Sequence, residues 1–296
     1  MKVRLKPMQL IRDQETPIKT RGINHRVGTF RYKELGEGEP GTPGNYNLRM
    51  VWSQTDFFSP RHRHNFDQVR VQITGTFSFD DDGVMRPGVV GYFPEGTQYG
   101  PQTSQMDTCT LVLQIGGPSG NGYLSEAARV AAVEQLAKTG RFEGGRYFSH
   151  EVPGDGADRG PGVDAFLAAW EMAHGRTMMY PPERMARPLL LHEDSIDWAA
   201  WPGVSGARRK RLWNLGAQTV GLEIYRLEAG AQLPLSGPAT CFVQQGEGAV
   251  QEGSCGTGLG RFNEQDTLHV GQGEIATLTA DEVARILVFT HPVFSV

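Results

Sequence analysis

The sequence predicts an all-β protein in which a short helical connector joins two β-barrel domains. Short runs of strand-forming residues, such as residues 47–52 and 69–73, alternate with turn clusters throughout residues 1–120. A helical period replaces this pattern in residues 121–190, and strand patterns return in residues 191–296. A chain of 296 residues is long enough for two domains that each bury a core.

The connector is predicted to contain two helices, near residues 124–139 and 164–174, because apolar residues recur there at near-helical spacing. Gly140 is placed to end the first helix, and Asp164 is placed to cap the start of the second. Residues 150–162, between the two helices, are rich in Gly, Pro and Asp and are predicted to form a loop.

The charge of the chain favours a small-molecule substrate as its main partner. The formal net charge is −4, so the chain lacks the cationic field that binding to nucleic acid or to an anionic membrane requires. The basic run at residues 208–211 is therefore interpreted as a solvated turn. No apolar stretch reaches the length of about 18 residues that a membrane span needs, so we expect a cytoplasmic protein. The sequence leaves a homodimer open.

The most informative segment for chemistry is residues 59–75, where two histidines are separated by one residue. Alternate residues of a strand point to the same side, so both imidazoles would face one centre. Continuing the alternation places apolar residues on the other face. A polar face of this kind is expected to line a cavity. Its members are His62, His64, Phe66, Gln68, Arg70 and Gln72.

These residues and a second segment resemble the two motifs of the cupin superfamily, G-x5-H-x-H-x3-4-E-x6-G and G-x5-P-x-G-x2-H-x3-N. On the first motif fall His62, His64, Gln68 and Gly75, with Asp56 in place of the opening Gly. On the second fall Gly88, Pro94, Gly96, Tyr99 and Thr103. The resemblance implies two double-stranded β-helix (jelly-roll) barrels, and the whole chain resembles uncharacterised bacterial and fungal bicupins.

The resemblance also implies a metal site, but the ligand set of this chain departs from the family pattern. Family sites typically use three His and one Glu, whereas this chain offers His62, His64, Gln68 and Tyr99. Two imidazoles and two oxygen donors could hold Fe, Mn, Ni or Zn with open positions for substrate. Without a carboxylate to balance the charge, a metal-free pocket is an equally weighted alternative.

Three residues are candidates for catalysis. Arg70 either pairs with a buried acid or anchors a carboxylate or enolate of the substrate, because a guanidinium inside a barrel is costly unless it is paired. Gln72 lies deeper on the same face of the strand. Tyr99 is expected to ligate a metal or to donate a proton.

The C-terminal barrel is predicted to have lost these polar residues. When Gly246 is aligned with Gly75, every position equivalent to a polar pocket residue becomes apolar, which predicts a dry core and a structural role. The aligned residues are Leu233, Leu235, Ala239 and Cys241.

Three functions follow from these observations. The first is a mononuclear metal-dependent oxidoreductase, similar to cupin dioxygenases, that acts on a small aromatic or enol/carbonyl compound. The second is a metal-free isomerase or lyase that uses Tyr99 and a histidine as acid and base. The third is a protein that binds a small molecule without catalysis.

Overall fold

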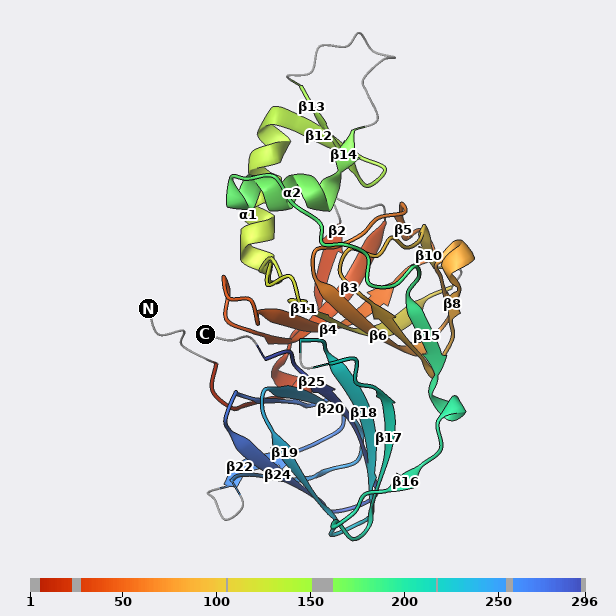
Figure 1. Ribbon diagram of the computed structural model, residues 1–296, viewed down its shortest axis with the longest axis vertical. Coiled ribbons are helices and arrows are strands. Elements are labelled where there is room, and N and C mark those ends of the chain that lie inside the picture. The colour runs from red at the N-terminus through yellow and green to blue at the C-terminus, as the bar shows by residue number, and fades with distance from the viewer. Residues whose placement is uncertain are drawn as a thin grey trace.

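The computed structural model describes residues 6–22, 28–104, 106–150, 162–216, 218–253 and 258–293. Within them the chain forms two β-barrels and a small helical unit at one end of the molecule (Figure 1). The predicted all-β class with a helical connector is confirmed. The predicted loop over residues 150–162 lies, apart from its two ends, outside the described residues.

The N-terminal barrel consists of a seven-stranded sheet and a four-stranded sheet. The larger sheet has the order β15-β9-β6-β11-β4-β3-β2, and the smaller sheet has the order β5-β10-β7-β8. The strands are β2 (Lys19–Gly22), β3 (Thr29–Glu37), β4 (Tyr46–Ser53), β5 (Phe58–Ser59), β6 (Asp67–Thr74), β7 (Phe77–Ser78), β8 (Val84–Met85), β9 (Val89–Phe93), β10 (Gln102–Ser104), β11 (Thr108–Ile115) and β15 (Leu189–His192).

The C-terminal barrel repeats this plan, with the sheet orders β1-β23-β20-β25-β18-β17-β16 and β19-β24-β21-β22. Its interior is an apolar core to which Leu233, Leu235 and Cys241 contribute, and Ala239 is also buried. The strands are β1 (Gln9–Ile11), β16 (Ala199–Ala200), β17 (Ala207–Trp213), β18 (Gly221–Leu227), β19 (Gln232–Ser236), β20 (Ala239–Gln245), β21 (Gly248–Glu252), β22 (Gly258–Phe262), β23 (Thr267–Val270), β24 (Ile275–Ala280) and β25 (Ala284–Thr290).

Two strands cross the expected domain boundaries. The segment β1, near the start of the chain, pairs with β23 of the C-terminal barrel. The segment β15, which follows the helices, pairs with β9 of the N-terminal barrel. The boundaries expected at residues 1–120, 121–190 and 191–296 therefore differ from the sheet pairing, because each barrel completes its larger sheet with a strand from elsewhere in the chain.

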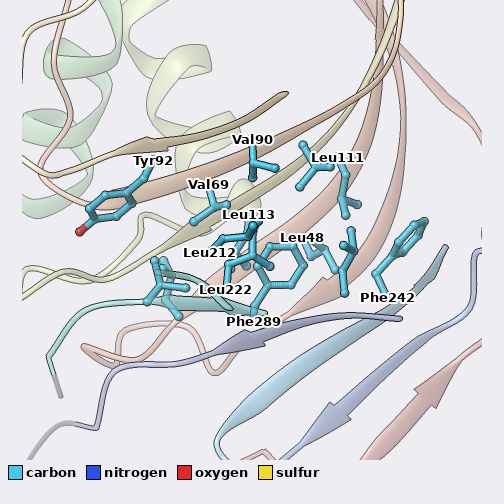
Figure 2. Close-up of a cluster of buried hydrophobic side chains, with 14 of the residues drawn as sticks. Leu48, Val69, Val90, Tyr92, Leu111, Leu113, Leu212, Leu222, Phe242 and Phe289 are labelled. Atoms are coloured by element: carbon cyan, nitrogen blue, oxygen red, sulfur yellow. The ribbon is translucent and has the colours of Figure 1, made fainter. Parts of the chain in front are cut away.

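The central strands of the N-terminal barrel are buried on both faces. One face of β6, β11 and β4 points into the barrel, and the other packs against the C-terminal barrel in a shared hydrophobic cluster (Figure 2). The N-terminal barrel contributes Leu48, Val69 and Leu113, and the C-terminal barrel contributes Leu222 and Phe289. Because these side chains occupy the outer face, the strand alternation leaves the inner face for polar residues.

The helical unit contains α1 (Glu126–Thr139) and α2 (Ala165–His174), together with a small sheet of β12 (Gly140–Glu143), β13 (Arg146–Ser149) and β14 (Val163–Asp164). The predicted caps are confirmed, because α1 ends immediately before Gly140 and Asp164 accepts hydrogen bonds from the first turn of α2. None of the helices that the structure describes is long and apolar enough to cross a membrane.

A buried acid fixes the end of the connector to the N-terminal barrel. The Asp67 carboxylate accepts hydrogen bonds from the Tyr92 hydroxyl at 2.7 Å, the Glu95 backbone N–H at 2.9 Å, and the guanidinium of Arg184. Burial raises the pKa of Asp67, while the positive charge of Arg184 opposes this rise. The connector is therefore held beside the first residue of β6.

The basic run at residues 208–211 is not a turn, and this expectation was wrong. The run lies within β17, where Lys210 is buried against Trp198 and its ammonium donates to the Glu193 carbonyl at 3.0 Å. The Arg211 guanidinium donates to Glu223 on the neighbouring strand at 2.6 Å. Cross-strand acids and an aromatic face let this charged run form a strand.

A polar cluster lies where the two barrels meet. The Tyr46 hydroxyl of β4 is 3.0 Å from Nδ1 of His269, and the Tyr46 ring also contacts the ring of His291. A second hydrogen bond of the cluster joins Thr240 Oγ1 to His291 Nε2 at 2.8 Å. Burial lowers the pKa of His269 from 6.5 to about 4, and it lowers the pKa of His291 as well.

This cluster predicts that acid destabilises the protein. An unfolded chain would protonate His269 near its ordinary pKa of 6.5, whereas the folded chain keeps it neutral to about 4. The free energy of unfolding is therefore unaffected by His269 above pH 6.5. It falls as the pH drops from 6.5 towards 4, because only the unfolded chain gains a proton there. We expect the free energy of unfolding to fall by on the order of 2–3 kcal/mol over this range.

Urea unfolding of the protein between neutral pH and about pH 4.5 measures this loss. In His269→Asn the side chain cannot ionise, so the variant should show a clearly smaller loss than the parent protein over the same range. Equal losses in the two proteins would contradict the assignment to this histidine.

Candidate functional site

The N-terminal barrel encloses a cavity of about 160 Å³ on the inner face of β6, β11 and β4. Three guanidinium groups and two imidazoles line it, and no carboxylate of the described residues does. Apolar side chains from the strands and from α2 form the rest of the wall. The charged lining residues are Arg49, Arg70, Arg129, His62 and His64, and the larger apolar ones are Phe30, Val51, Phe57, Phe77, Val112 and Phe166.

His62 is held by the backbone and lines the cavity. Its backbone exchanges two hydrogen bonds with Tyr99, at 3.1 and 2.9 Å. Nδ1 lies 2.7 Å from the Pro60 carbonyl, which can only accept, so Nδ1 carries the proton. In the neutral ring Nε2 is then the acceptor, 3.3 Å from the side-chain amide nitrogen of Gln102. This tautomer suits either a proton acceptor or a metal ligand.

His64 is enclosed by aromatic rings from the strand and from the helical unit. Its ring stacks on Phe66 with ring centroids 4.4 Å apart. It also makes a T-shaped contact with Phe166 of α2, with ring centroids 4.9 Å apart. The rings of His62 and His64 are 4.8 Å apart. The two imidazoles expected to face one centre are therefore neighbours, and both line the cavity.

Among the described residues, Arg70 has only neutral hydrogen-bond partners. Its Nε donates to Gln68 Oε1 at 2.7 Å, and Nη1 donates to Gln102 Oε1 at 3.0 Å. The guanidinium also lies over the rings of Phe77, Phe79 and Phe93, at 5.1 to 5.6 Å. Among the described residues no Asp or Glu forms an ion pair with it.

No acid of the described part of the chain therefore compensates the charge of Arg70. Burial lowers the pKa of its guanidinium, and interaction with Tyr99 partly opposes that shift. An arginine stays protonated in proteins even so, because its ordinary pKa lies above about 12. The described residues do not pair Arg70 with a buried acid. Its guanidinium is instead compatible with an anion from outside the chain.

Tyr99 and Gln72 lie outside the wall of the cavity. The Tyr99 hydroxyl is buried and donates to Gln68 Oε1 at 3.5 Å. Gln72 uses its amide within the barrel, donating to the Thr74 carbonyl at 2.7 Å and accepting from the Thr110 hydroxyl at 2.9 Å. The structure brings His62, His64, Gln68 and Tyr99 together, whereas Gln72 is held by its neighbours in the sheet.

The described residues fit a divalent metal only in part. The imidazoles of His62 and His64 are suitable donors, but Gln68 Oε1 already accepts a hydrogen bond from the positive charge of Arg70. A cation on that oxygen would lie beside a guanidinium, which opposes binding. No group of three His, Cys, Asp or Glu side chains suited to a metal occurs within the part of the chain that the structure describes. Mononuclear sites commonly use three protein ligands, so these residues do not complete one.

Several lining residues were not anticipated from the sequence. Arg49 is the one charged residue of β4 and lies between Leu48 and Met50, and a single charge between apolar residues was the signal that could have identified it. Arg129 and Phe166 come from the two helices, whose only predicted role was to connect the barrels. The helical unit is therefore part of the cavity wall.

Comparison with known proteins finds likeness at the level of structure alone. No protein-family model matches the chain, and no curated protein matches it. Among solved structures, Streptomyces albus HEPD with 2-hydroxyethylphosphonate and Fe(II) bound superposes with a TM-score of 0.60 at 15% identity. That match covers 96% of this chain and 76% of the other.

Two further structures extend the comparison. A putative dioxygenase from Nostoc punctiforme matches with a TM-score of 0.57 at 12% identity, over 98% of this chain and 85% of that protein. The oxalate decarboxylase of Bacillus subtilis matches with a TM-score of 0.55 at 13% identity, over 99% and 78% of the two chains. These likenesses cover nearly the whole chain and show the bicupin fold, as the resemblance of the motifs had implied.

Proposed function

We propose that the N-terminal barrel binds a small organic anion against Arg70 and acts on it as an acid–base enzyme that moves a proton through His62. The observation that carries this proposal is the lining of the cavity, which has three arginines and two histidines but no carboxylate among the described residues, and in which Arg70 has no described acid partner. A half-buried positive charge such as that of Arg70, without a counter-ion among the described residues, becomes more favourable when a carboxylate or enolate arrives.

The size of the cavity limits the ligand. About 150 Å³ of apolar space is enough to hold a benzene molecule, so the volume of about 160 Å³ suits one ring or a short chain. The proposed substrate is a small carboxylate. It carries an acidic C–H bond next to a carbonyl group, because proton transfer to His62 requires such a bond.

The chemistry that these groups support is an enolisation. Nε2 of His62 takes the proton from the carbon, the electrons of the C–H bond move to the carbonyl oxygen, and an enolate forms. The fixed positive charge of Arg70 stabilises the negative charge that develops. Return of the proton to another atom completes an isomerisation, which needs no further reactant.

Replacing Arg70 tests the binding step. Arg70→Met keeps a long side chain of similar shape but removes the charge, so the affinity for benzoate should fall by at least about thirtyfold. The thermal stability of the free protein should stay the same or rise, because an uncompensated buried charge is removed. Calorimetric titration and thermal unfolding measure the two quantities, and Arg141→Gln, on the exposed surface, is the matched control. Unchanged benzoate binding in Arg70→Met would refute the assignment.

A second candidate function is the metal-dependent oxidoreductase, dioxygenase-like, acting on a small aromatic or enol/carbonyl compound. It is favoured by the pair of neighbouring imidazoles and by the likeness to HEPD, which holds Fe(II). Elemental analysis of protein purified without chelators decides between the candidates. One equivalent of Fe, Mn, Ni or Zn that His62→Ala loses would support the second function, and protein without stoichiometric metal that still catalyses proton exchange would support the first.

A further inference from the structure

The cavity carries positive charge at two separate places. Arg49 on β4 and Arg70 on β6 are both neighbours of Val112 on the strand between them. Two strand spacings of about 4.8 Å therefore place their Cα atoms roughly 10 Å apart in one row across the sheet. All three side chains line the cavity, with the apolar Val112 between the two guanidinium groups.

The end of the cavity at Arg49 is built differently from the end at Arg70. Arg49 donates to Glu34 at 3.1 Å and to Glu126 of α1 at 3.0 Å. Both acids have other partners, because Lys19 lies 2.8 Å from Glu34 and Arg129 lies 2.7 Å from Glu126. Lys19, Arg49 and Arg129 thus share these two acids, and Glu37 also interacts electrostatically with Arg49.

One donor at this end has no partner in the part of the chain that the structure describes. Nε of Arg49 is buried, and no described residue accepts a hydrogen bond from it. The guanidinium is buried beside the cavity, and it shares both of its acid partners with other cations. An unmade buried hydrogen bond of a charged group is costly, which leaves the Arg49 guanidinium incompletely satisfied by the described residues.

From these observations we infer that the ligand of the N-terminal barrel is a dianion with one acidic group at each end, and that Arg49 selects for the second group. This inference rests on the proposed function, since Arg70 holds the first acidic group. An apolar or aromatic body of the ligand then passes Val112, and Phe166 of α2 closes over it. Arg49 is a specificity-determining residue, and Glu126 links its position to the helical unit.

Calorimetric titration with benzoate and isophthalate tests the inference, because the two probes share a ring and differ by one carboxylate. Isophthalate should bind the parent protein at least about tenfold more tightly than benzoate. In Arg49→Gln this preference should disappear, while the affinity for benzoate stays within about threefold. Glu34 and Glu126 keep Lys19 and Arg129 as partners in this variant, so it should fold.

Two further variants keep the outcomes distinct. Arg129→Gln weakens the same end of the cavity and should reduce the preference for isophthalate even if Arg49→Gln proves unstable. The exposed Arg141→Gln should keep it. Equal affinities for the two probes in the parent protein, or a preference that survives both cavity variants, would overturn the dianion inference and leave Arg70 as an anion site. Failure of both probes to bind would instead remove the proposed function itself.

Discussion

We expect His62→Ala to slow catalysed proton exchange by about 10²- to 10⁴-fold, the range typical for loss of a general base. The probe is 2-oxobutyrate, a small carboxylate with an acidic C–H bond beside its carbonyl group. Incorporation of deuterium from D2O at that carbon, followed by NMR, measures the rate. The physical reason is that Nδ1 of His62 is held by the Pro60 carbonyl, which leaves Nε2 as the proton acceptor, and the side chain of Gln102 contacts both Nε2 and Arg70.

The same variant should cost little stability, since residues around a cavity are less tightly packed than a core. Thermal unfolding of His62→Ala should therefore resemble that of the parent protein. His150→Ala, which removes an exposed histidine far along the chain, should change neither rate nor stability. Absence of exchange above the solvent rate in the parent protein would count against acid–base catalysis, and unfolding of His62→Ala would make this histidine structural.

Leu113→Asp should unfold both barrels at once. Leu113 is fully buried in the cluster that the two barrels share, and an unpaired carboxylate there should cost more than about 4 kcal/mol. Because the cluster contains side chains from both domains, the second barrel loses its contact surface together with the first (Figure 2). Hydrogen exchange of amides in β24, deep in the C-terminal barrel, reports this loss.

Leu215→Asp is the matched control, because Leu215 is 43% exposed. Its free energy of unfolding should stay within about 0.5 kcal/mol of the parent value. Protected amides in β24 of Leu113→Asp would mean that the C-terminal barrel folds without its neighbour, and would contradict a shared core.

The strand alternation was sufficient to predict which residues face the cavity from β6. Gln68 and Arg70 point inward while Val69 and Val71 belong to the core between the barrels, because the period of two is a property of the extended backbone itself. What the alternation could not show is whether an inward residue reaches open space. Gln72 has the same orientation, yet its neighbours in the sheet use its whole amide.

The local sequence pattern could not predict which strands the short strands pair with. The segment β1 has three residues and β15 has four, and nothing in so few residues specifies a strand partner more than 90 positions away. The contribution of Arg129 to the cavity was hidden for a similar reason, because its side chain reaches the site only through the packing of α1 against the barrel. Tertiary contacts decide both features.

The pairing of β1 with β23 and of β15 with β9 also determines when each barrel can complete its larger sheet during synthesis. The first barrel cannot complete its larger sheet until residues 189–192 have emerged, and β1 must wait for β23 at residues 267–270. Meanwhile the outer face of β6 and β11 has no second barrel to cover it, because its partners lie between Leu212 and Phe289. A nascent chain of intermediate length thus displays an apolar surface of the kind that chaperones bind. Chains that stop between these points should aggregate rather than yield a soluble single barrel.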